Sequence, residues 1–268
     1  MKRLISDILK SLGIEYFSIL AYNDQRETNK SIIERADFTP KSVIVFLLPY
    51  YSGETVNLSR YASSLDYHIA LREITDSIIE ELKDKYPEYS FCGYGDHSPI
   101  DERYAALIGG LGIAGDSGLL INEKYGTYVF IGDIITDIPP EAIGAMTPKP
   151  IVCCDHCGSC KRACPTGILA GTGTDCLSAI TQRKGELSES EADLMRKYNT
   201  VWGCDICQIS CPYNKDPKIT PVGFFHKERI PLLTSEILSS MDKEAFRLRA
   251  FAWRGRKTVE RNLKLLKY

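Results

Sequence analysis

Residues 154–165 read Cys154-Asp-His-Cys-Gly-Ser-Cys-Lys-Arg-Ala-Cys-Pro165, which is a C-x2-C-x2-C-x3-C-P run. A shorter run, C-x2-C-x3-C-P, occupies residues 204–212, and Cys176 lies alone between the two runs. Runs of this kind bind [4Fe–4S] clusters, and in two-cluster proteins the fourth cysteine of a run ligates the other cluster. The eight thiols therefore predict two [4Fe–4S] clusters and a protein that moves electrons.

The crossover between the two runs predicts how the ligands are shared. One cluster takes Cys154, Cys157, Cys160 and Cys211, and the other takes Cys164, Cys176, Cys204 and Cys207. Structural zinc is the alternative, but zinc sites usually use C-x2-C pairs that are well separated from each other. Cys92 and Cys153 are expected to be buried thiols. If Cys153 is a ligand in place of Cys176, the pairing changes but the count of two clusters does not.

Composition and charge are those of an ordinary globular protein. The 268 residues carry a formal net charge of only -2, so the overall charge does not indicate a nucleic-acid or membrane partner. No apolar run is long enough to span a bilayer, and the first residues lack the apolar core of a signal peptide. We therefore expect a cytoplasmic monomer, in whose reducing surroundings clustered cysteines favour metal or redox sites over disulfides.

The first part of the chain alternates helix-like and strand-like segments, which predicts a layered α/β (α+β) fold. Residues 42–48 form a continuous apolar run, typical of a strand buried in the middle of a sheet. The other expected strands are 16–21, 90–93, 119–121 and 128–135, with the last two paired around 122–126. The expected helices are 4–12, 65–82 and 102–108.

Three consecutive parts are expected: an α/β domain over 1–145, a cysteine-rich domain over 146–230 and a helical segment over 231–268. Prolines between residues 139 and 150 mark the first boundary. Residues 188–191, Ser-Glu-Ser-Glu, have the pattern of a capping box that starts a helix. Residues 243–268 contain nine Lys or Arg and two Glu, a side-chain charge of +7. That segment either packs on the cysteine-rich domain as a solvated helix or contacts RNA.

Two features of the α/β part have competing interpretations. Residues 110–115 match G-x-G-x-x-G, but a helix is expected before them and a strand after them, which is the wrong context for a dinucleotide site. Asp96 comes at the end of an expected strand, just before Ser98-Pro99. It is either a helix cap or, if its pKa is raised by burial, a proton donor facing a cofactor.

An ordered series of motifs resembles one known family. The series is Asp66-Tyr-His68, Asp96-x-Ser-Pro-x-x-Glu-Arg103, Gly110-Leu-Gly112, Leu119-Leu-Ile121, Gly132-Asp-Ile-Ile-Thr-Asp137, Cys157-Gly-Ser-Cys160, Cys164-Pro-Thr-Gly167 and Gly203-Cys-Asp-Ile-Cys-Gln-Ile-Ser-Cys-Pro212. It resembles the epoxyqueuosine reductase family, the cobalamin-dependent, two-cluster enzymes of tRNA queuosine synthesis. It is more distantly similar to the reductive dehalogenases.

The resemblance implies a nitroreductase-like α/β domain that holds cobalamin, followed by a ferredoxin-like domain with two [4Fe–4S] clusters and a short helical C-terminus. Asp96 corresponds to the aspartate that donates a proton, and His68 to a histidine near cobalamin and substrate. The other cofactor contacts implied by the motifs are Tyr67, Ser98, Gly112 and Gly115. The implied partners are tRNA, through its anticodon loop, and a low-potential electron donor such as flavodoxin or ferredoxin.

The chain departs from that family in three places. Gly115-Asp116-Ser117 stands where the family usually reads Gly-Lys-Asn, the connection over 23–41 is shorter, and the family's helical-repeat extension is expected to be absent. These departures leave two alternatives open. One is a reductase of a small molecule such as an organohalide, and the other is a non-catalytic electron-transfer or corrinoid-binding protein.

Overall fold

A four-stranded sheet forms the core of the first part of the chain. In the computed structural model, which describes residues 1–268, its strands are β1 (Phe17–Ala21), β2 (Ser42–Pro49), β6 (Val129–Thr136) and β3 (Phe91–Gly95), in that spatial order. All three pairings are antiparallel. Every residue of β2 is buried, because neighbouring strands pair with both of its edges and other elements cover both faces. The prediction of a buried central strand is confirmed.

A small hairpin corrects one predicted pairing. Strand β5 (Leu120–Ile121) pairs with β4 (Ile113–Ala114) and not with β6. The expected pairing of 119–121 with 128–135 is therefore wrong, since both edges of β6 are already taken by β2 and β3. Only the bridge between Asn122 and Gly126 remains of it.

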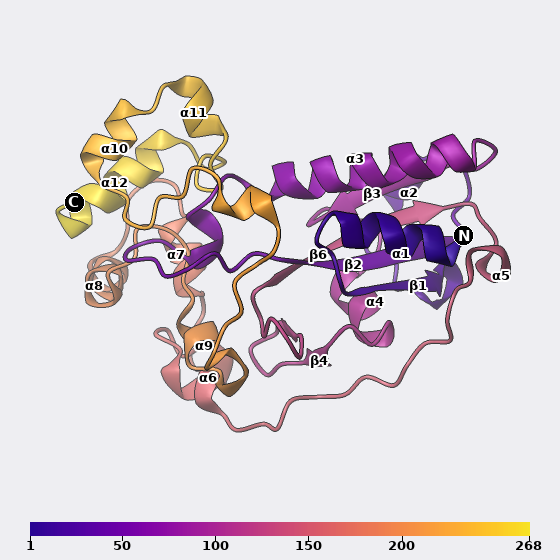
Figure 1. Cartoon of the computed structure of the whole chain (residues 1–268). Helices are drawn as coiled ribbons and strands as arrows, with labels where there is room; N and C mark the ends of the chain where they lie inside the picture. Colours follow the sequence, from indigo (N-terminus) through magenta and orange to yellow (C-terminus); the bar gives the residue numbers. More distant parts are fainter. The chain divides into compact units, whose positions relative to one another are not determined.

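The helices of this part cover the two faces of the sheet (Figure 1). They are α1 (Lys2–Ser11), α2 (Lys30–Ile33), α3 (Tyr67–Lys85), α4 (Glu102–Ile108) and α5 (Pro140–Ile143). Helix α3 approaches one face closely, because a Cβ atom at Gly93 would lie 2.5 Å from the Thr75 side chain and one at Gly95 would overlap the side chain of Leu71. Helix α4 packs on the opposite face, where its alanines and Leu107 join strand residues in an apolar core.

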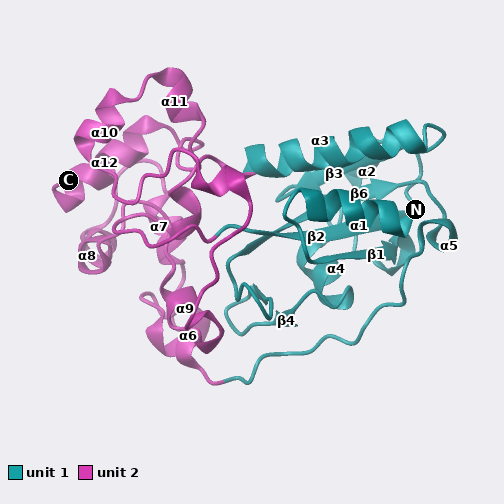
Figure 2. Cartoon of the chain, in the orientation of Figure 1, with its two compact units in different colours: residues 1–50, 68–156 teal, residues 51–67, 157–268 magenta.

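The chain divides into two compact units that do not follow the three expected parts (Figure 2). Unit 1 contains residues 1–50 and 68–156, and unit 2 contains residues 51–67 and 157–268. Residues 51–67, expected in the first domain, pack with unit 2. The Ser59 amide donates a hydrogen bond to the Trp202 carbonyl, and the Val201 amide donates one to the Asn57 carbonyl. The helical C-terminus belongs to the same unit as the cysteine-rich region.

Unit 2 consists of short helices and turns. Its helices are α6 (Ser159–Ala163), α7 (Leu177–Thr181), α8 (Glu189–Tyr198), α9 (Ile206–Ile209), α10 (Ser235–Ser240), α11 (Lys243–Arg247) and α12 (Arg256–Leu266). The predicted capping box is present, because Ser188 and Glu191 each accept the other's backbone amide. Trp202 and Phe251 lie at the centre of its larger core, both fully buried. No helix of the structure has the length and apolarity that a bilayer span requires.

Candidate functional site

Asp96 and His68 lie together at one edge of the sheet. Asp96 follows β3 directly, and His68 is the second residue of α3. The His68 Nε2 and Asp96 Oδ2 atoms lie 3.2 Å apart, and the side chains are 46% and 61% exposed, respectively. The burial that the sequence interpretation attached to a proton donor at Asp96 is therefore absent. Asp96 has φ of 64°, in the left-handed region that non-glycine residues rarely adopt. The cap interpretation of Asp96 is wrong, because the Asp101 side chain caps α4 by accepting the amide of Tyr104.

A cavity of about 280 Å³ lies beside this pair in unit 1. Its walls are the first turns of α3 and the end of β3, where Gly93 and Gly95 contribute no side chains. The lining residues are His68, Leu71, Arg72, Thr75, Asp76, Gly93, Tyr94, Gly95 and His97. Imidazole, guanidinium and carboxylate groups at one cavity suit a ligand with hydrogen-bonding and anionic substituents.

Two carboxyls, the buried one of Asp133 and the half-buried one of Glu102, lie behind Asp96, on the α4 side of the sheet. Asp133, in the middle of β6, is completely buried, and burial raises its pKa to about 7, although the nearby Ser98 hydroxyl opposes the rise. Glu102 is the first residue of α4, and burial, reinforced by the charges of Asp133 and Asp96, raises its pKa to about 8. Neither residue was predicted, although a charged residue inside the apolar run of β6 was a visible signal.

The other expected cofactor contacts have local structural roles. Ser98 is buried, and its hydroxyl accepts the Ile100 amide in the loop after Asp96. A Cβ atom at Gly112 would lie 2.5 Å from the Ile121 carbonyl oxygen, and one at Gly115 would lie 2.9 Å from that of Leu119. These glycines thus let the β4–β5 hairpin close. Tyr67 belongs to unit 2, where its ring packs edge-on against Tyr61.

The hairpin also carries a group of possible metal ligands. Asp116 Oδ1 lies 2.7 Å from His156 Nδ1, and ligand atoms of both residues lie within 4.8 Å of the Cys154 thiol. The residue that replaces the family's lysine therefore pairs with a histidine next to an expected cluster ligand. Cys153, expected to be buried, is exposed, and its backbone forms a bridge to Ala114 of the hairpin. Cys92 is half-buried against the core.

Four thiols of unit 2 lie close enough to influence one another electrostatically: Cys164, Cys176, Cys204 and Cys207. Burial raises the pKa of Cys204 to about 11 and that of Cys207 to about 12, and the charges of neighbouring cysteines add to both shifts. At Cys164, burial is outweighed by backbone amides, including that of Leu169, and by the Thr166 hydroxyl, which lower its pKa. The structure thus brings together the four residues that the crossover assigns to one cluster.

The remaining expected ligands come from both units. Cys157 and Cys160 lie at α6, and Cys211 follows α9, whose residues contact those of α6 within unit 2. Cys154 lies in unit 1. All ten cysteines are free of disulfide bonds, so their thiols can serve as ligands.

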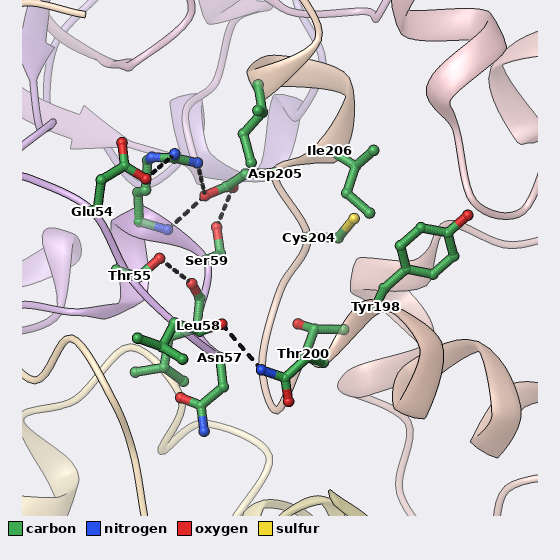
Figure 3. A pocket seen from close by; sticks show the side chains of 14 residues that line it. Glu54, Thr55, Asn57, Leu58, Ser59, Tyr198, Thr200, Cys204, Asp205 and Ile206 are labelled. Atoms are coloured by element: carbon green, nitrogen blue, oxygen red, sulfur yellow. Dashed lines mark hydrogen bonds and ion pairs between the residues drawn. The ribbon is translucent and has the colours of Figure 1, made fainter.

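The segment 51–67 holds the second cysteine loop in place (Figure 3). Asp205, between Cys204 and Ile206, is buried, and its carboxylate accepts the Ser59 hydroxyl and the Arg60 amide, the latter at 2.6 Å. Burial raises the pKa of Asp205, while these hydrogen bonds and the Arg60 charge act against the rise. A cavity of about 130 Å³, also lined by Cys204, lies beside this contact. The glycine before Cys204 has φ of 76°, and a Cβ there would overlap Ser59.

The basic C-terminal segment packs on the rest of unit 2, as one of the two interpretations expected. Arg256 donates to the carbonyls of Leu238 and Met241, and Arg261 donates to those of Arg183 and Gly185. These guanidinium groups bind backbone oxygens of the same chain. Trp253 is different, because its side chain is 59% exposed. The Arg254 guanidinium stacks on its ring at 3.7 Å.

Comparison with known proteins shows which families the chain resembles. Residues 153–214 match the family of 4Fe-4S double cluster binding domains. Epoxyqueuosine reductase from Listeria monocytogenes is 34% identical over 83% of the chain, and that from Bacillus cereus is 32% identical over 83%. The chain spans 62% of the length of each of these relatives. Epoxyqueuosine reductase from Leadbetterella byssophila is 29% identical and is covered to 81%.

Solved structures show the same fold. An epoxyqueuosine reductase from Streptococcus thermophilus superimposes with a TM-score of 0.75 at 25% identity, over 99% of this chain and 80% of that one. An epoxyqueuosine reductase bound to an epoxyqueuosine-modified tRNA-Tyr stem loop gives a TM-score of 0.78, over 98% and 80%. A reductive dehalogenase, at 17% identity and a TM-score of 0.51 over 81% and 32%, shares only the fold.

Proposed function

Because the chain is homologous to the epoxyqueuosine reductases, we propose that it is an oxidoreductase that converts epoxyqueuosine to queuosine in tRNA. One observation carries this proposal: an exposed carboxyl, Asp96, pairs with His68 beside a cavity in a chain that also holds a double [4Fe–4S] cluster domain. A proton donor and an electron relay are the two components that a reductive removal of oxygen requires.

The proposed cluster ligands are the two crossed sets. Cys164, Cys176, Cys204 and Cys207 hold one cluster, and their mutual effects on pKa support this set. Cys154, Cys157, Cys160 and Cys211 hold the other, following the spacing of the first run. Asp205 fixes the loop between Cys204 and Cys207 through its bonds to Ser59 and Arg60.

Cobalamin is the second proposed cofactor, and the imidazole and guanidinium groups of the cavity beside His68 suit its amide and phosphate substituents. When bound, it supplies the strongly reducing metal centre that the chain's own side chains cannot provide. His68 is the direct contact that the exposed pair supports best, with Tyr67 next to it in the sequence. Gly112 and Gly115 shape the hairpin, and Ser98 shapes the loop that carries Asp96.

The protein's own residues then position substrate and move protons. Asp96 donates a proton to the epoxide oxygen as its bond to carbon breaks, which avoids the formation of an alkoxide. His68 orients the Asp96 carboxyl through the 3.2 Å contact. Electrons enter from a low-potential donor such as flavodoxin or ferredoxin and pass through the clusters.

A reconstituted turnover assay tests the proposal directly. With cobalamin, restored clusters and a low-potential reductant, the protein is expected to convert epoxyqueuosine to queuosine in tRNA, as measured by mass spectrometry of the nucleosides. Turnover of an aryl bromide but not of tRNA would indicate a small-molecule reductase instead. Reduction of the clusters with no turnover of either substrate would indicate an electron-transfer protein.

Substrate binding should depend on the exposed aromatic ring of unit 2. We expect Trp253→Ala to weaken binding of an epoxyqueuosine-containing stem loop, because a base stacked on an aromatic ring contributes about 1–3 kcal/mol. The ring is 59% exposed, so the folding stability should change little. Fluorescence anisotropy measures the affinity, and Tyr213→Ala, at another exposed aromatic of unit 2, is the matched control. Equal affinities for the two variants would contradict a role of Trp253 in RNA binding.

A further inference from the structure

The buried carboxyl of Asp133 has no charged partner. Asp133 lies in the middle of β6, opposite Val45 on one side and Tyr94 on the other. Its side chain points to the same face as those of Ile131 and Ile135, which join the apolar core under α4. The Ser98 hydroxyl lies near enough to lower its pKa, but neither carboxyl oxygen has a hydrogen bond of normal length and angle, and the residue is 0% exposed. An ionised carboxylate without a partner is strongly unfavourable in such a place, so a buried carboxyl here holds a proton.

Glu102 connects this buried group to the Asp96 loop. Its carboxyl accepts a hydrogen bond from the backbone amide of Asp96, and its second oxygen, Oε1, is buried without a partner. The charge of Asp133 acts on Glu102, and so does the charge of Asp96. The three carboxyls therefore form a series from the centre of the sheet to the exposed end of β3.

The other ionisable groups around this series are neutral or engaged elsewhere. Burial raises the pKa of the Tyr22 and Tyr94 phenols, to about 12 for Tyr22, and the charge of Asp133 raises both further. Both phenols are therefore neutral near pH 7. Asp101 caps α4. Of the neighbouring arginines, Arg26 stacks on the ring of Tyr104 at 3.8 Å, and Arg103 donates to the Gly118 carbonyl. A network of ion pairs thus does not explain the two carboxyls.

The proposed reaction needs more protons than Asp96 holds. Reduction of an epoxide to an alkene and water consumes two electrons and two protons, because both carbon–oxygen bonds break and the oxygen leaves as water. Asp96 carries one proton and becomes a carboxylate once it has donated it. Bound tRNA would also limit the access of bulk water to this carboxylate.

We propose that Glu102 and Asp133 form a proton reserve that reprotonates Asp96 between the two proton transfers of one turnover. The inference rests on the proposed function. Glu102 passes its proton to the Asp96 carboxylate, with a water at the loop as the bridge, and the proton of Asp133 replaces it. The electrons come from the low-potential donor, and solvent refills the reserve after the product leaves. Both residues act through Asp96 and do not contact the substrate.

Infrared spectroscopy of the full-length protein without substrate tests the reserve first. The carbonyl stretch of a protonated carboxylic acid is expected at pH 6 and should disappear as the pH rises through about 7 and about 8. Glu102→Gln and Asp133→Asn should each remove part of this band. Glu81→Gln, at an exposed position of α3, should leave it unchanged. The absence of the band at pH 6 would overturn the proposal.

The turnover of tRNA tests the function of the reserve. We expect Glu102→Gln to lower kcat about tenfold or more, with KM unchanged, since proton transfer by a positioned group contributes at least this much. In the wild type the rate should fall as the pH rises through about 8, and this fall should be absent in Glu102→Gln. Glu102→Asp, which keeps a carboxyl, should recover part of the rate.

The outcomes separate the two proposals. If the wild type does not convert epoxyqueuosine in tRNA, the proposed function fails, and the reserve fails with it. If the wild type is active but Glu102→Gln matches Glu81→Gln in rate and pH profile, only the reserve is rejected. A loss of rate in Glu102→Gln that keeps the wild-type pH profile and is not recovered by Glu102→Asp would show a purely structural role and would also reject the reserve.

Discussion

Replacing Asp96 with asparagine is expected to abolish the conversion of epoxyqueuosine to queuosine and to leave both clusters in place. The amide has nearly the same shape and can keep the contact to His68, which is 3.2 Å in the structure. It has no acidic proton to give to the departing oxygen. A positioned general acid contributes about 10²–10⁴-fold to a rate, and a loss of that size is expected in a single-turnover assay with pre-reduced protein.

The control for this experiment is a second carboxyl of the same cavity. Asp76 lines the cavity beside Asp96 but lies on the exposed side of α3, so Asp76→Asn should keep most of the activity. The visible spectrum and iron content of both variants should match those of the wild type. Unchanged turnover in Asp96→Asn would reject the proton-donor role, and equal losses in the two variants would indicate that charge in the cavity matters more than the proton.

The left-handed backbone of Asp96 strains the loop after β3, so this loop must be held in place by its surroundings. A non-glycine residue with φ of 64° is strained, and such strain persists only where the surrounding structure enforces it. Two hydrogen bonds hold the loop here. The Glu102 carboxyl accepts one from the Asp96 backbone amide, and the Ser98 hydroxyl accepts the other from the Ile100 amide. A Bacillus subtilis relative has been solved with its catalytic aspartate loop swung out of the active site. In this chain, Glu102 is the residue best placed to hold the loop in one position.

The elements that the sequence predicted well depend on local patterns. The buried strand at 42–48 is an unbroken apolar run, and the helix starting after Ser188 has a capping box. Both patterns are read over a few neighbouring residues, so tertiary contacts have little chance to change the outcome. The cysteine spacing is also a local pattern, and it predicted the double [4Fe–4S] cluster domain that residues 153–214 match, whereas the crossed sharing of ligands stays a prediction.

The errors and omissions involve residues that are distant in the sequence. The residues at 119–121 were paired with 128–135 because they are neighbours in the chain, whereas β6 had already used both edges on β2 and β3. One of the two interpretations of Asp96, a helix cap, is wrong, because only the structure shows that the Asp101 carboxylate accepts the Tyr104 amide at the start of α4. The contact of Ser59 with Asp205 joins positions 146 residues apart, and no local pattern predicts such a pairing.

Replacing Cys204 with alanine is expected to remove one of the two clusters and to abolish turnover with it. Four thiolates cannot remain charged side by side in a half-buried pocket, and the raised pKa values of Cys204 and Cys207 express this cost. Iron neutralises that charge, so the cluster and its ligands form together. Loss of one ligand should reduce the iron content to about half and remove one signal from the electron paramagnetic resonance spectrum of the reduced protein.

The same measurement decides which cysteine completes this cluster. Cys176→Ala should match Cys204→Ala in iron content and spectrum, because the charge of Cys176 acts on the thiols of both Cys204 and Cys207. Cys153→Ala should keep both clusters, because Cys153 is exposed in unit 1 and bridges Ala114. If Cys153→Ala instead loses a cluster while Cys176→Ala keeps both, the crossed assignment of ligands is wrong. Cys92→Ala, half-buried against the core under α4, is the control for the loss of a thiol as such.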